Sequence, residues 1–247
     1  MSGIAILSAG IVLTVLPVAA MIIYGVRTKT PAGVFVTGAV CFILFAGIFE
    51  SLLHQVVLGT TPVMSDPVLY VIYGCFAAGI FEETGRLFGF RVLLKKERAG
   101  KAACAYGLGH GGTECILTAG ATFLVIGLSG LVSGIPGISP ATLLQFDAMR
   151  ASVTAGGILL SILERVSAML THTGLSMIMF RASKEKGKLM LWPASILIHA
   201  AADVAPAMYQ AGLLKDIILT EILTALFSAA VFAAGLKILK GYREEEQ

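Results

Sequence analysis

The chain has 247 residues and a formal net charge of +3, and 57% of its residues are hydrophobic while only 13% are charged. Its mean hydropathy of +0.88 is far outside the range of soluble globular domains. This composition excludes a soluble enzyme. Because most of the basic residues lie in short segments between apolar stretches, no nucleic acid is expected as a partner.

Apolar stretches of about 20 residues, long enough to cross a bilayer as helices, recur seven times along the chain. The expected spans are residues 3–26, 32–58, 68–90, 102–129, 155–180, 189–211 and 216–237. We predict an all-α fold, a polytopic transmembrane helix bundle of about seven spans in the cell membrane. No remaining segment is long enough for a separate soluble domain, so residues 1–247 are expected to form a single transmembrane domain.

The longest connection, about residues 130–154, has a composition of its own. It contains Pro136, Pro140 and several glycines, followed by an apolar stretch that ends at Phe146. This pattern is compatible with a loop, a re-entrant element or an eighth helix.

The basic residues set the expected orientation. Under the seven-span topology 14 of the 18 Lys and Arg residues fall on one side, because only Arg150 and Lys215 fall opposite and Arg86 and Arg165 lie within spans. Cytoplasmic loops of membrane proteins carry an excess of Lys and Arg. The N-terminus is therefore expected outside and the C-terminus in the cytoplasm.

The four cysteines, Cys41, Cys75, Cys104 and Cys115, all lie within apolar spans. They do not form the CxxC spacing that is typical of metal and redox sites. We expect reduced thiols that pack as small apolar side chains.

Four of the expected spans carry ionisable side chains at one depth. Glu82, His110, His172 and His199 each lie about nine to eleven residues from a basic residue at one end of their span, which is about 13 to 17 Å at the rise of an α-helix. A charge at the bilayer centre costs about 2.5 to 3.5 kcal/mol on insertion scales, so such residues are rare unless they face one another. With Glu83, the four side chains are expected to form one polar layer.

Helical spacing extends this layer into stripes. Three pairs of residues are four positions apart and so share a helix face: Glu82 with Arg86, His110 with Glu114, and His199 with Asp203. Lipid cannot satisfy a polar stripe, so the three stripes are expected to point inward and to line a common wet cavity.

Metal-assisted hydrolysis is the chemistry that such a layer favours. A catalytic zinc usually takes three protein ligands and a water, and His110, His172 and His199 provide three imidazoles. Glu82 or Glu83 can accept the proton of the attacking water, while the other binds metal or orients a ligand. The alternative is a buried hydrogen-bond network that only specifies helix packing.

Other polar residues lie near the layer. Glu50 and His54, four apart toward the outer end of the second span, are expected to form a separate interfacial pair. Glu164 and Arg165 lie about two turns from His172. They form either a simple buried ion pair or a supporting contact behind the layer.

Four glycines surround His110: Gly107, Gly109, Gly111 and Gly112. Glycines are costly inside a helix unless something needs close backbone approach. Two explanations stay open, namely close packing against another helix and room for an extended substrate backbone.

Three motifs resemble those of the type II CAAX-prenyl endopeptidase and bacteriocin-processing superfamily. They are Glu82-Glu83-Thr84-Gly85-Arg86, Tyr106-Gly107-Leu108-Gly109-His110 and His199-Ala200-Ala201-Ala202-Asp203. More closely still, the chain resembles the YhfC-type branch of intramembrane metalloproteases, through Gly109-His110-Gly111-Gly112-Thr113-Glu114, Leu163-Glu164-Arg165 and Thr171-His172-Thr173. The motifs occur in order over a core of about residues 80–205.

The resemblance implies a seven- or eight-helix intramembrane endopeptidase in which Glu82 activates water. It implies that His110, His199 and Asp203 belong to the core site and that His172 is a further ligand of this branch. The chain departs from the superfamily in three places. Two residues rather than three separate Glu83 from Arg86. Tyr106 replaces a phenylalanine, and Asp203 replaces the asparagine of the prenyl proteases. The aspartate favours metal binding or acid and base work.

These considerations give a definite set of candidate residues. The predicted catalytic residues are Glu82, Glu83 and Arg86; the predicted metal ligands are His110, His172, His199, Asp203 and Glu114; and the predicted supporting residues are Glu164, Arg165 and Tyr106. The predicted function is a multi-pass intramembrane endopeptidase that depends on Zn²⁺, with membrane lipids and a membrane-bound peptide or protein substrate as partners. The alternatives are a glutamate-dependent protease without metal, a non-catalytic membrane scaffold, and a proton-coupled transporter.

Overall fold

A computed structural model describes residues 1–131 and 138–242, and within these ranges the chain forms helices and no strands, which confirms the predicted all-α class. The α-helices are α1 (Gly3–Thr28), α2 (Ala32–Phe42), α3 (Ser51–Thr60), α4 (Pro67–Phe88), α5 (Lys101–Cys115), α6 (Ala121–Ser129), α7 (Pro140–Ser152), α8 (Ala155–Lys184), α9 (Leu191–Gln210) and α10 (Ile217–Lys240). Their bounds agree closely with the seven apolar stretches of the sequence once the joined helices described next are counted together.

Short π-helical segments join or extend several of these helices. The segment η1 (Ile43–Glu50) connects α2 to α3, and η4 (Ile116–Gly120) connects α5 to α6, so each pair forms one continuous rod. A third π segment, η3 (Gly89–Leu93), extends α4, and a short 3-10 turn, η2 (Pro62–Ser65), precedes it. A π turn holds an extra residue and changes which residues share a face, and it is frequent at functional sites.

Polar side chains fix where several helices begin. Ser2, Asp66, Ser139, Thr154 and Asp216 each precede a helix and accept hydrogen bonds from backbone N–H groups of its first turn. These bonds satisfy donors that have no partner within the helix. The apolar stretches of the sequence therefore start at defined residues rather than fraying.

The protein is a multi-pass integral membrane protein, although the expected count of seven spans stays a prediction. Among the described residues, five helices or helical rods are long and apolar enough to cross a bilayer, and the count rises to six if the bent pair of α7 and α8 is one span. α4 does not qualify, and it carries Glu82, Glu83 and Arg86. The orientation of the chain also stays a prediction.

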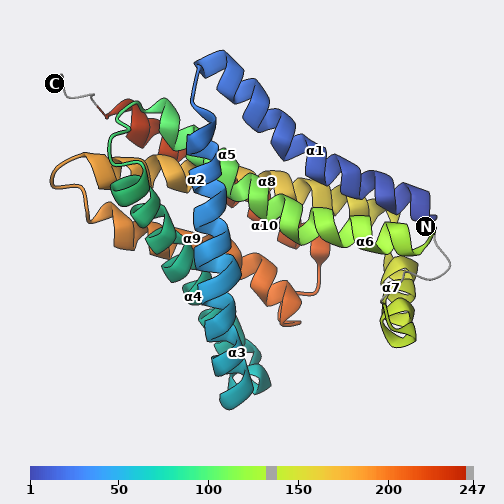
Figure 1. The fold of residues 1–247 in the computed structure, drawn as a ribbon. Helices are drawn as coiled ribbons and strands as arrows, with labels where there is room; N and C mark the ends of the chain where they lie inside the picture. Colours follow the sequence, from blue (N-terminus) through green and yellow to red (C-terminus); the bar gives the residue numbers. More distant parts are fainter. Residues whose placement is uncertain (132–137, 243–247) are drawn as a thin grey trace.

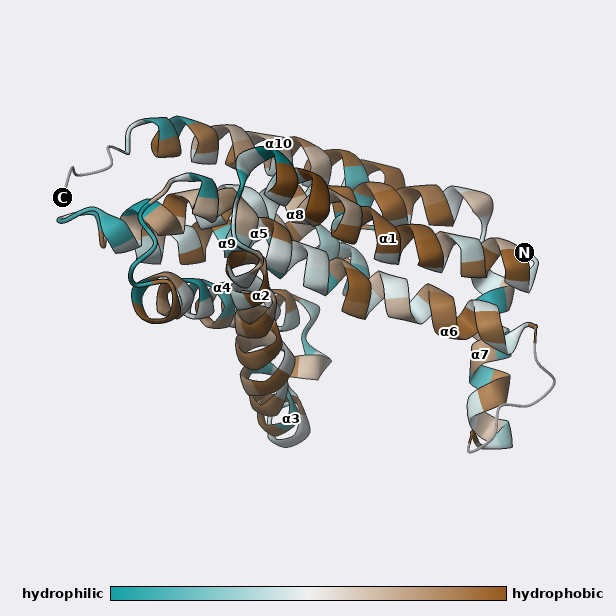
Figure 2. Ribbon diagram, turned by 45° about the horizontal axis from the view of Figure 1, so that its top comes forward, coloured by the Kyte–Doolittle hydropathy of each residue, from teal (hydrophilic) through white to brown (hydrophobic). Residues whose placement is uncertain are grey.

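The helices form two crossing groups (Figure 1). α1, the α5–α6 rod, α8 and α10 run side by side, while the α2–α3 rod and α4 cross them and α9 packs on α4 (Figures 1 and 2). The groups meet where α2 packs on α5 and where α4 and α9 contact α8. In Figure 2 the hydrophilic parts of the ribbon gather toward the end that holds the C-terminus, whereas the long helices are largely hydrophobic.

Glycines allow the helices to approach closely at this crossing. A Cβ atom on Gly109 of α5 would lie 2.1 Å from the backbone oxygen of Phe35 on α2, and one on Gly38 would lie 2.2 Å from the backbone oxygen of Tyr106. On the other side of α5, a Cβ on Gly107 would lie 2.5 Å from the Cα atom of Thr173 on α8. Of the two explanations for the glycines, the structure favours close helix packing.

The connection between α6 and α8 contains a helix rather than a plain loop. α7 begins at Pro140 and makes an angle of 94° with α8. In both ribbon views it projects sideways from the far end of the long helices (Figures 1 and 2). Three residues of this connection, Gly134, Pro136 and Gly137, lie outside the described residues.

The four cysteines are free thiols, as expected. Cys41, Cys75 and Cys115 are buried, and Cys104 is half-buried. The Sγ atom of Cys115 donates a hydrogen bond to the backbone oxygen of Leu13, which ties α5 to α1. The cysteines therefore pack between helices.

Candidate functional site

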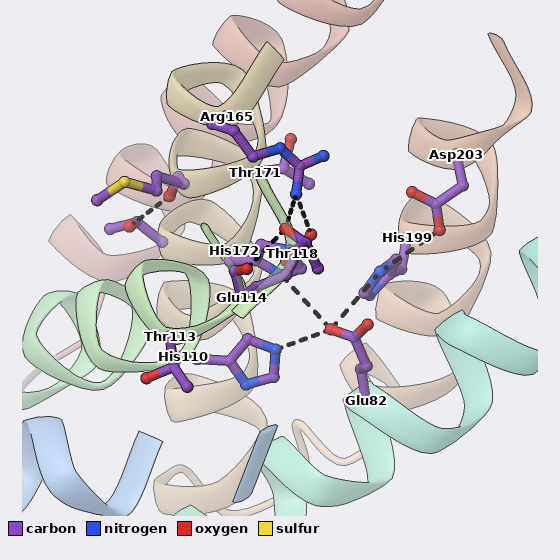
Figure 3. A network of polar contacts seen from close by, with 12 residues as sticks. Glu82, His110, Thr113, Glu114, Thr118, Arg165, Thr171, His172, His199 and Asp203 are labelled. Carbon is purple, nitrogen blue, oxygen red and sulfur yellow. Dashed lines mark hydrogen bonds and ion pairs between the residues drawn. The ribbon is translucent and has the colours of Figure 1, made fainter. Parts of the chain in front are cut away.

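The predicted polar layer is a compact buried cluster. Glu82 and Glu83 come from α4, His110 from α5, His172 from α8 and His199 from α9, and none of the five residues is more than 7% exposed. Figure 3 shows the three imidazoles and the carboxylate of Glu82 pointing toward one another. Side chains far apart in the sequence thus converge where the two groups of helices cross.

Glu82 lies at the centre of this cluster. Its Oε2 atom is 2.7 Å from Nε2 of His110, 3.6 Å from Nδ1 of His172 and 3.9 Å from Nε2 of His199. One carboxylate oxygen therefore faces three imidazole nitrogens from three other helices. A buried carboxylate is tolerated only where such partners are present.

Glu83 points to a different part of the cluster. Its Oε1 atom lies 2.7 Å from Nδ1 of His199 and also contacts the guanidinium group of Arg86. The side chain is fully buried, and only Glu82 of the two glutamates lines the cavity described below. The adjacent glutamates therefore have separate environments, because neighbouring residues on a helix point about 100° apart.

Arg86 bridges Glu83 and the histidines. Its guanidinium is fully buried, and its NH2 group lies 2.7 Å from Nδ1 of His172 and 3.8 Å from Oε2 of Glu82. Although the spacing before Arg86 departs from the superfamily pattern, the side chain reaches the cluster. It supplies the positive charge that a buried glutamate pair needs.

Further polar contacts involve Nε2 of His172, the ring nitrogen that does not face Glu82. Glu114 contacts Nε2 of His172 and accepts a hydrogen bond of 2.8 Å from Arg165. Arg165 also donates to Glu164. At 3.2 Å it donates to the hydroxyl of Thr118 as well (Figure 3). Arg165 is thus both an ion-pair partner of Glu164 and a supporting contact of the layer.

The remaining predicted residues lie at the margin. Asp203 Oδ2 is 3.5 Å from Nε2 of His199, and its side chain is 39% exposed. The hydroxyl of Tyr106 donates a hydrogen bond of 3.3 Å to the backbone oxygen of Gly85, and its ring stacks near that of His110. Asp203 therefore borders the cavity, while Tyr106 holds α5 against the glutamate motif of α4.

The buried cluster fits a catalytic metal ion. Ligand atoms of Glu82, His110 and His172 lie within 4.8 Å of one another, and all three residues are buried. Two histidines and one glutamate form a donor set that is known for catalytic zinc. This set differs from the predicted one, because Glu82 belongs to it while His199, Asp203 and Glu114 do not.

A cavity of about 360 Å³ opens beside the cluster. Its lining includes Glu82, His172, His199, Arg165, His54 and Tyr73. Polar groups from α3, α4, α8 and α9 therefore border the cavity. A volume of this size is in the usual range for ligand sites.

The interpretation of Glu50 and His54 as a separate interfacial pair was wrong. The pair itself exists, since Nε2 of His54 lies 3.2 Å from Oε1 of Glu50. However, Glu50 is buried, and His54 borders the same cavity as Glu82 while its Nδ1 atom lies 2.7 Å from the hydroxyl of Tyr73. Counting positions along one span missed this, because such a count does not show that His54 of α3 packs against Tyr73 of α4.

Sequence reasoning also missed the contribution of α10. Thr224 and Ser228 line the cavity, and the hydroxyl of Thr171 on α8 donates a hydrogen bond of 2.8 Å to the hydroxyl of Ser228. Isolated hydroxyl residues in an apolar span give almost no signal in a sequence. Their four-residue spacing on one helix face is the only feature that pointed to them.

The chain is similar to known proteins over most of its length. A family model described as YhfC intramembrane metalloprotease matches residues 12–224. The chain is 32% identical over 233 residues to the uncharacterized membrane protein YhfC of Bacillus subtilis (strain 168), and the alignment covers 90% of each chain. No solved structure matches the chain. The matched region contains the site residues described above with the exception of Ser228.

Proposed function

This chain belongs to the YhfC intramembrane metalloprotease family, and we propose that it is a zinc-dependent endopeptidase that hydrolyses a peptide bond of a membrane-associated polypeptide. The observation that carries this proposal is the position of Glu82, whose carboxylate meets three imidazoles beside a polar cavity. Burying such a group of ionisable side chains inside a membrane protein costs free energy, and groups of this kind usually mark a functional site.

We assign the metal to Glu82, His110 and His172, because their ligand atoms lie closest together. When bound, the metal would polarise the peptide carbonyl and lower the pKa of a water molecule. The contact of Glu114 with Nε2 of His172 orients that ring, so that Nδ1 faces Glu82. Histidines that hold metals commonly have such a carboxylate on the other ring nitrogen.

His199 is suited to move the proton. Glu83 contacts its Nδ1 atom, so Nε2 faces Glu82 and the cavity. A carboxylate that orients an imidazole in this way is a recurrent arrangement for a general base. In the proposed reaction water attacks the peptide carbon, its proton passes to Nε2 of His199 and then to the leaving amine as the carbon–nitrogen bond breaks.

This division of roles differs from the one that the resemblance implies, in which Glu82 is the base. The two assignments, Glu82 as metal ligand or Glu82 as base, predict opposite zinc contents for variants of Glu82 and His199. If Glu82 is a ligand, Glu82→Gln loses zinc, whereas His199→Asn keeps zinc and loses turnover. If Glu82 is the base and His199 a ligand, the pattern of metal content is reversed.

The test is metal analysis of the purified full-length protein, combined with cleavage of a fluorescently labelled single-span reporter polypeptide in proteoliposomes. We expect about one zinc per chain in the wild type, and a loss of turnover of about 10² to 10⁴ in His199→Asn. The control is Glu185→Gln, which is also a glutamate-to-glutamine exchange but lies at the end of α8, far from the cluster. This variant should keep both its zinc and its turnover. A wild-type protein that binds no zinc and cleaves no reporter would instead support a structural network.

A further inference from the structure

A second and larger cavity lies against other faces of α5 and α8. It is an apolar groove of about 650 Å³ between α1, α5, α8 and α10. Leu108 and Thr173 line this groove, while their helix neighbours His110 and His172 belong to the cluster. The groove and the catalytic cavity share no lining residue.

The groove offers almost nothing to a polar ligand. Its few polar groups already have partners, since the hydroxyl of Thr173 donates 2.7 Å to the backbone oxygen of Met169 and that of Tyr24 donates 3.1 Å to the backbone oxygen of Lys101. The floor is buried, with Met177 only 1% exposed, while Leu16 at the rim is 40% exposed. An apolar, flexible chain is the ligand that such a lining accepts.

The length of the groove corresponds to one leaflet of a bilayer. Along α1 it extends from Leu16 to Tyr24, and along α8 from Val166 to Met177. At 1.5 Å per residue these stretches are about 12 and 16 Å long. Half of a hydrocarbon core of about 30 Å is about 15 Å.

Basic residues follow the groove at one end on all four helices. Three or four positions beyond its last lining residues stand Arg27 after Tyr24, Lys101 before Cys104, Arg181 after Met177 and Lys240 after Leu236. Lys101 donates 3.0 Å to the backbone oxygen of Thr28, and Arg181 pairs with Glu185, so these two are already engaged. Arg27 and Lys240 are exposed.

We propose that this groove binds one acyl chain of an anionic phospholipid, whose phosphate is held by Arg27 and Lys240. The apolar lining accepts the chain, the length of the groove matches a single leaflet, and the two cations complement the headgroup. Tyr24 at the end of the groove stands at the depth where tyrosines of membrane proteins meet the interface. This site does not depend on the proposed peptidase activity.

The experiment is native mass spectrometry of the full-length protein in detergent with added phosphatidylglycerol or phosphatidylcholine of identical acyl chains. We expect the wild type to retain phosphatidylglycerol at least fivefold more than phosphatidylcholine. The double variant Arg27→Gln/Lys240→Gln should lower phosphatidylglycerol to the level of phosphatidylcholine. The double variant Lys188→Gln/Lys215→Gln removes the same charge outside the groove and should keep the preference.

A second variant tests the groove itself. Ala19→Trp fills it and should lower the retention of both lipids, whereas Ala201→Trp on an exposed face of α9 should not. Equal retention of the two lipids by the wild type overturns the proposal, and so does an equal effect of the two double charge variants. A retained polypeptide or a second copy of the chain that Ala19→Trp releases would assign the groove to a protein partner instead.

Discussion

The guanidinium group of Arg86 lies 2.7 Å from Nδ1 of His172, the ring nitrogen that faces Glu82. A nitrogen that accepts a hydrogen bond from a cation has no lone pair left for a metal ion. Arg86 therefore competes with the metal in the proposed site, while it also neutralises the buried Glu83. The same side chain stabilises the metal-free fold and opposes metal binding.

Replacement of Arg86 by glutamine should separate these effects. Because the positive charge is lost, we expect zinc to bind about tenfold tighter or more, which corresponds to about 1.4 kcal/mol. The free energy of unfolding of the metal-free protein should fall by about 3 kcal/mol, because Glu83 loses its ion-pair partner. Isothermal titration and thermal unfolding with and without zinc measure the two changes. Arg86→Lys keeps the charge and is the control; a weaker zinc affinity in Arg86→Gln would contradict the competition.

Replacement of Glu114 by glutamine should weaken metal binding from a distance. Glu114 contacts His172 and is itself held by Arg165, so the exchange loosens the orientation of the imidazole. Contacts of this kind usually contribute a factor of 10 to 100 in metal affinity. Glu164→Gln is the matched control, since Glu164 also binds Arg165 but contacts no histidine at the site. Equal zinc dissociation constants for the two variants would rule out this role of Glu114.

Replacement of Gly109 by alanine should destabilise the crossing of α2 and α5. The new methyl group would meet backbone atoms of Phe35, which cannot move aside as a side chain can. We expect the free energy of unfolding to fall by about 1 to 3 kcal/mol, as for other overpacked protein interiors. Gly33→Ala on α2 has open space around its Cβ position and should not destabilise the protein. Thermal unfolding in detergent compares the two, and an unchanged transition in Gly109→Ala would show that the helices separate more easily than their contact suggests.

Replacement of His54 by phenylalanine should leave the metal site intact. Tyr73, the partner of His54, is nine residues from Glu82 on α4, or about 13 Å. An extended substrate covers that distance with about four residues. We therefore expect unchanged zinc affinity and a raised KM for the reporter polypeptide. A lower zinc affinity would place His54 within the metal site.

Much of this arrangement could be predicted from the sequence because it depends on local signals. The bounds of the spans follow from apolar length and from caps such as Asp66, and the common depth of Glu82 and His110 follows from helical rise. The contact between Arg165 and Glu114 could not be predicted in this way, because 51 residues separate them. Which of Glu82 and Glu83 faces the cavity also depends on how α4 packs against its neighbours.

The composition of α4 has a consequence for biogenesis. This helix carries Glu82, Glu83 and Arg86 within 22 residues. At the bilayer centre, the depth that the sequence predicts, three charges would cost about 9 kcal/mol for an isolated helix. Arg86 contacts Glu82 and Glu83 on α4 itself. The other partners come from α5, α8 and α9, all of which are synthesised later. α4 should therefore leave the translocon in a stable form only when these later helices join it. Substitutions of His110 or His199 should accordingly lower the amount of inserted protein as well as its catalytic competence.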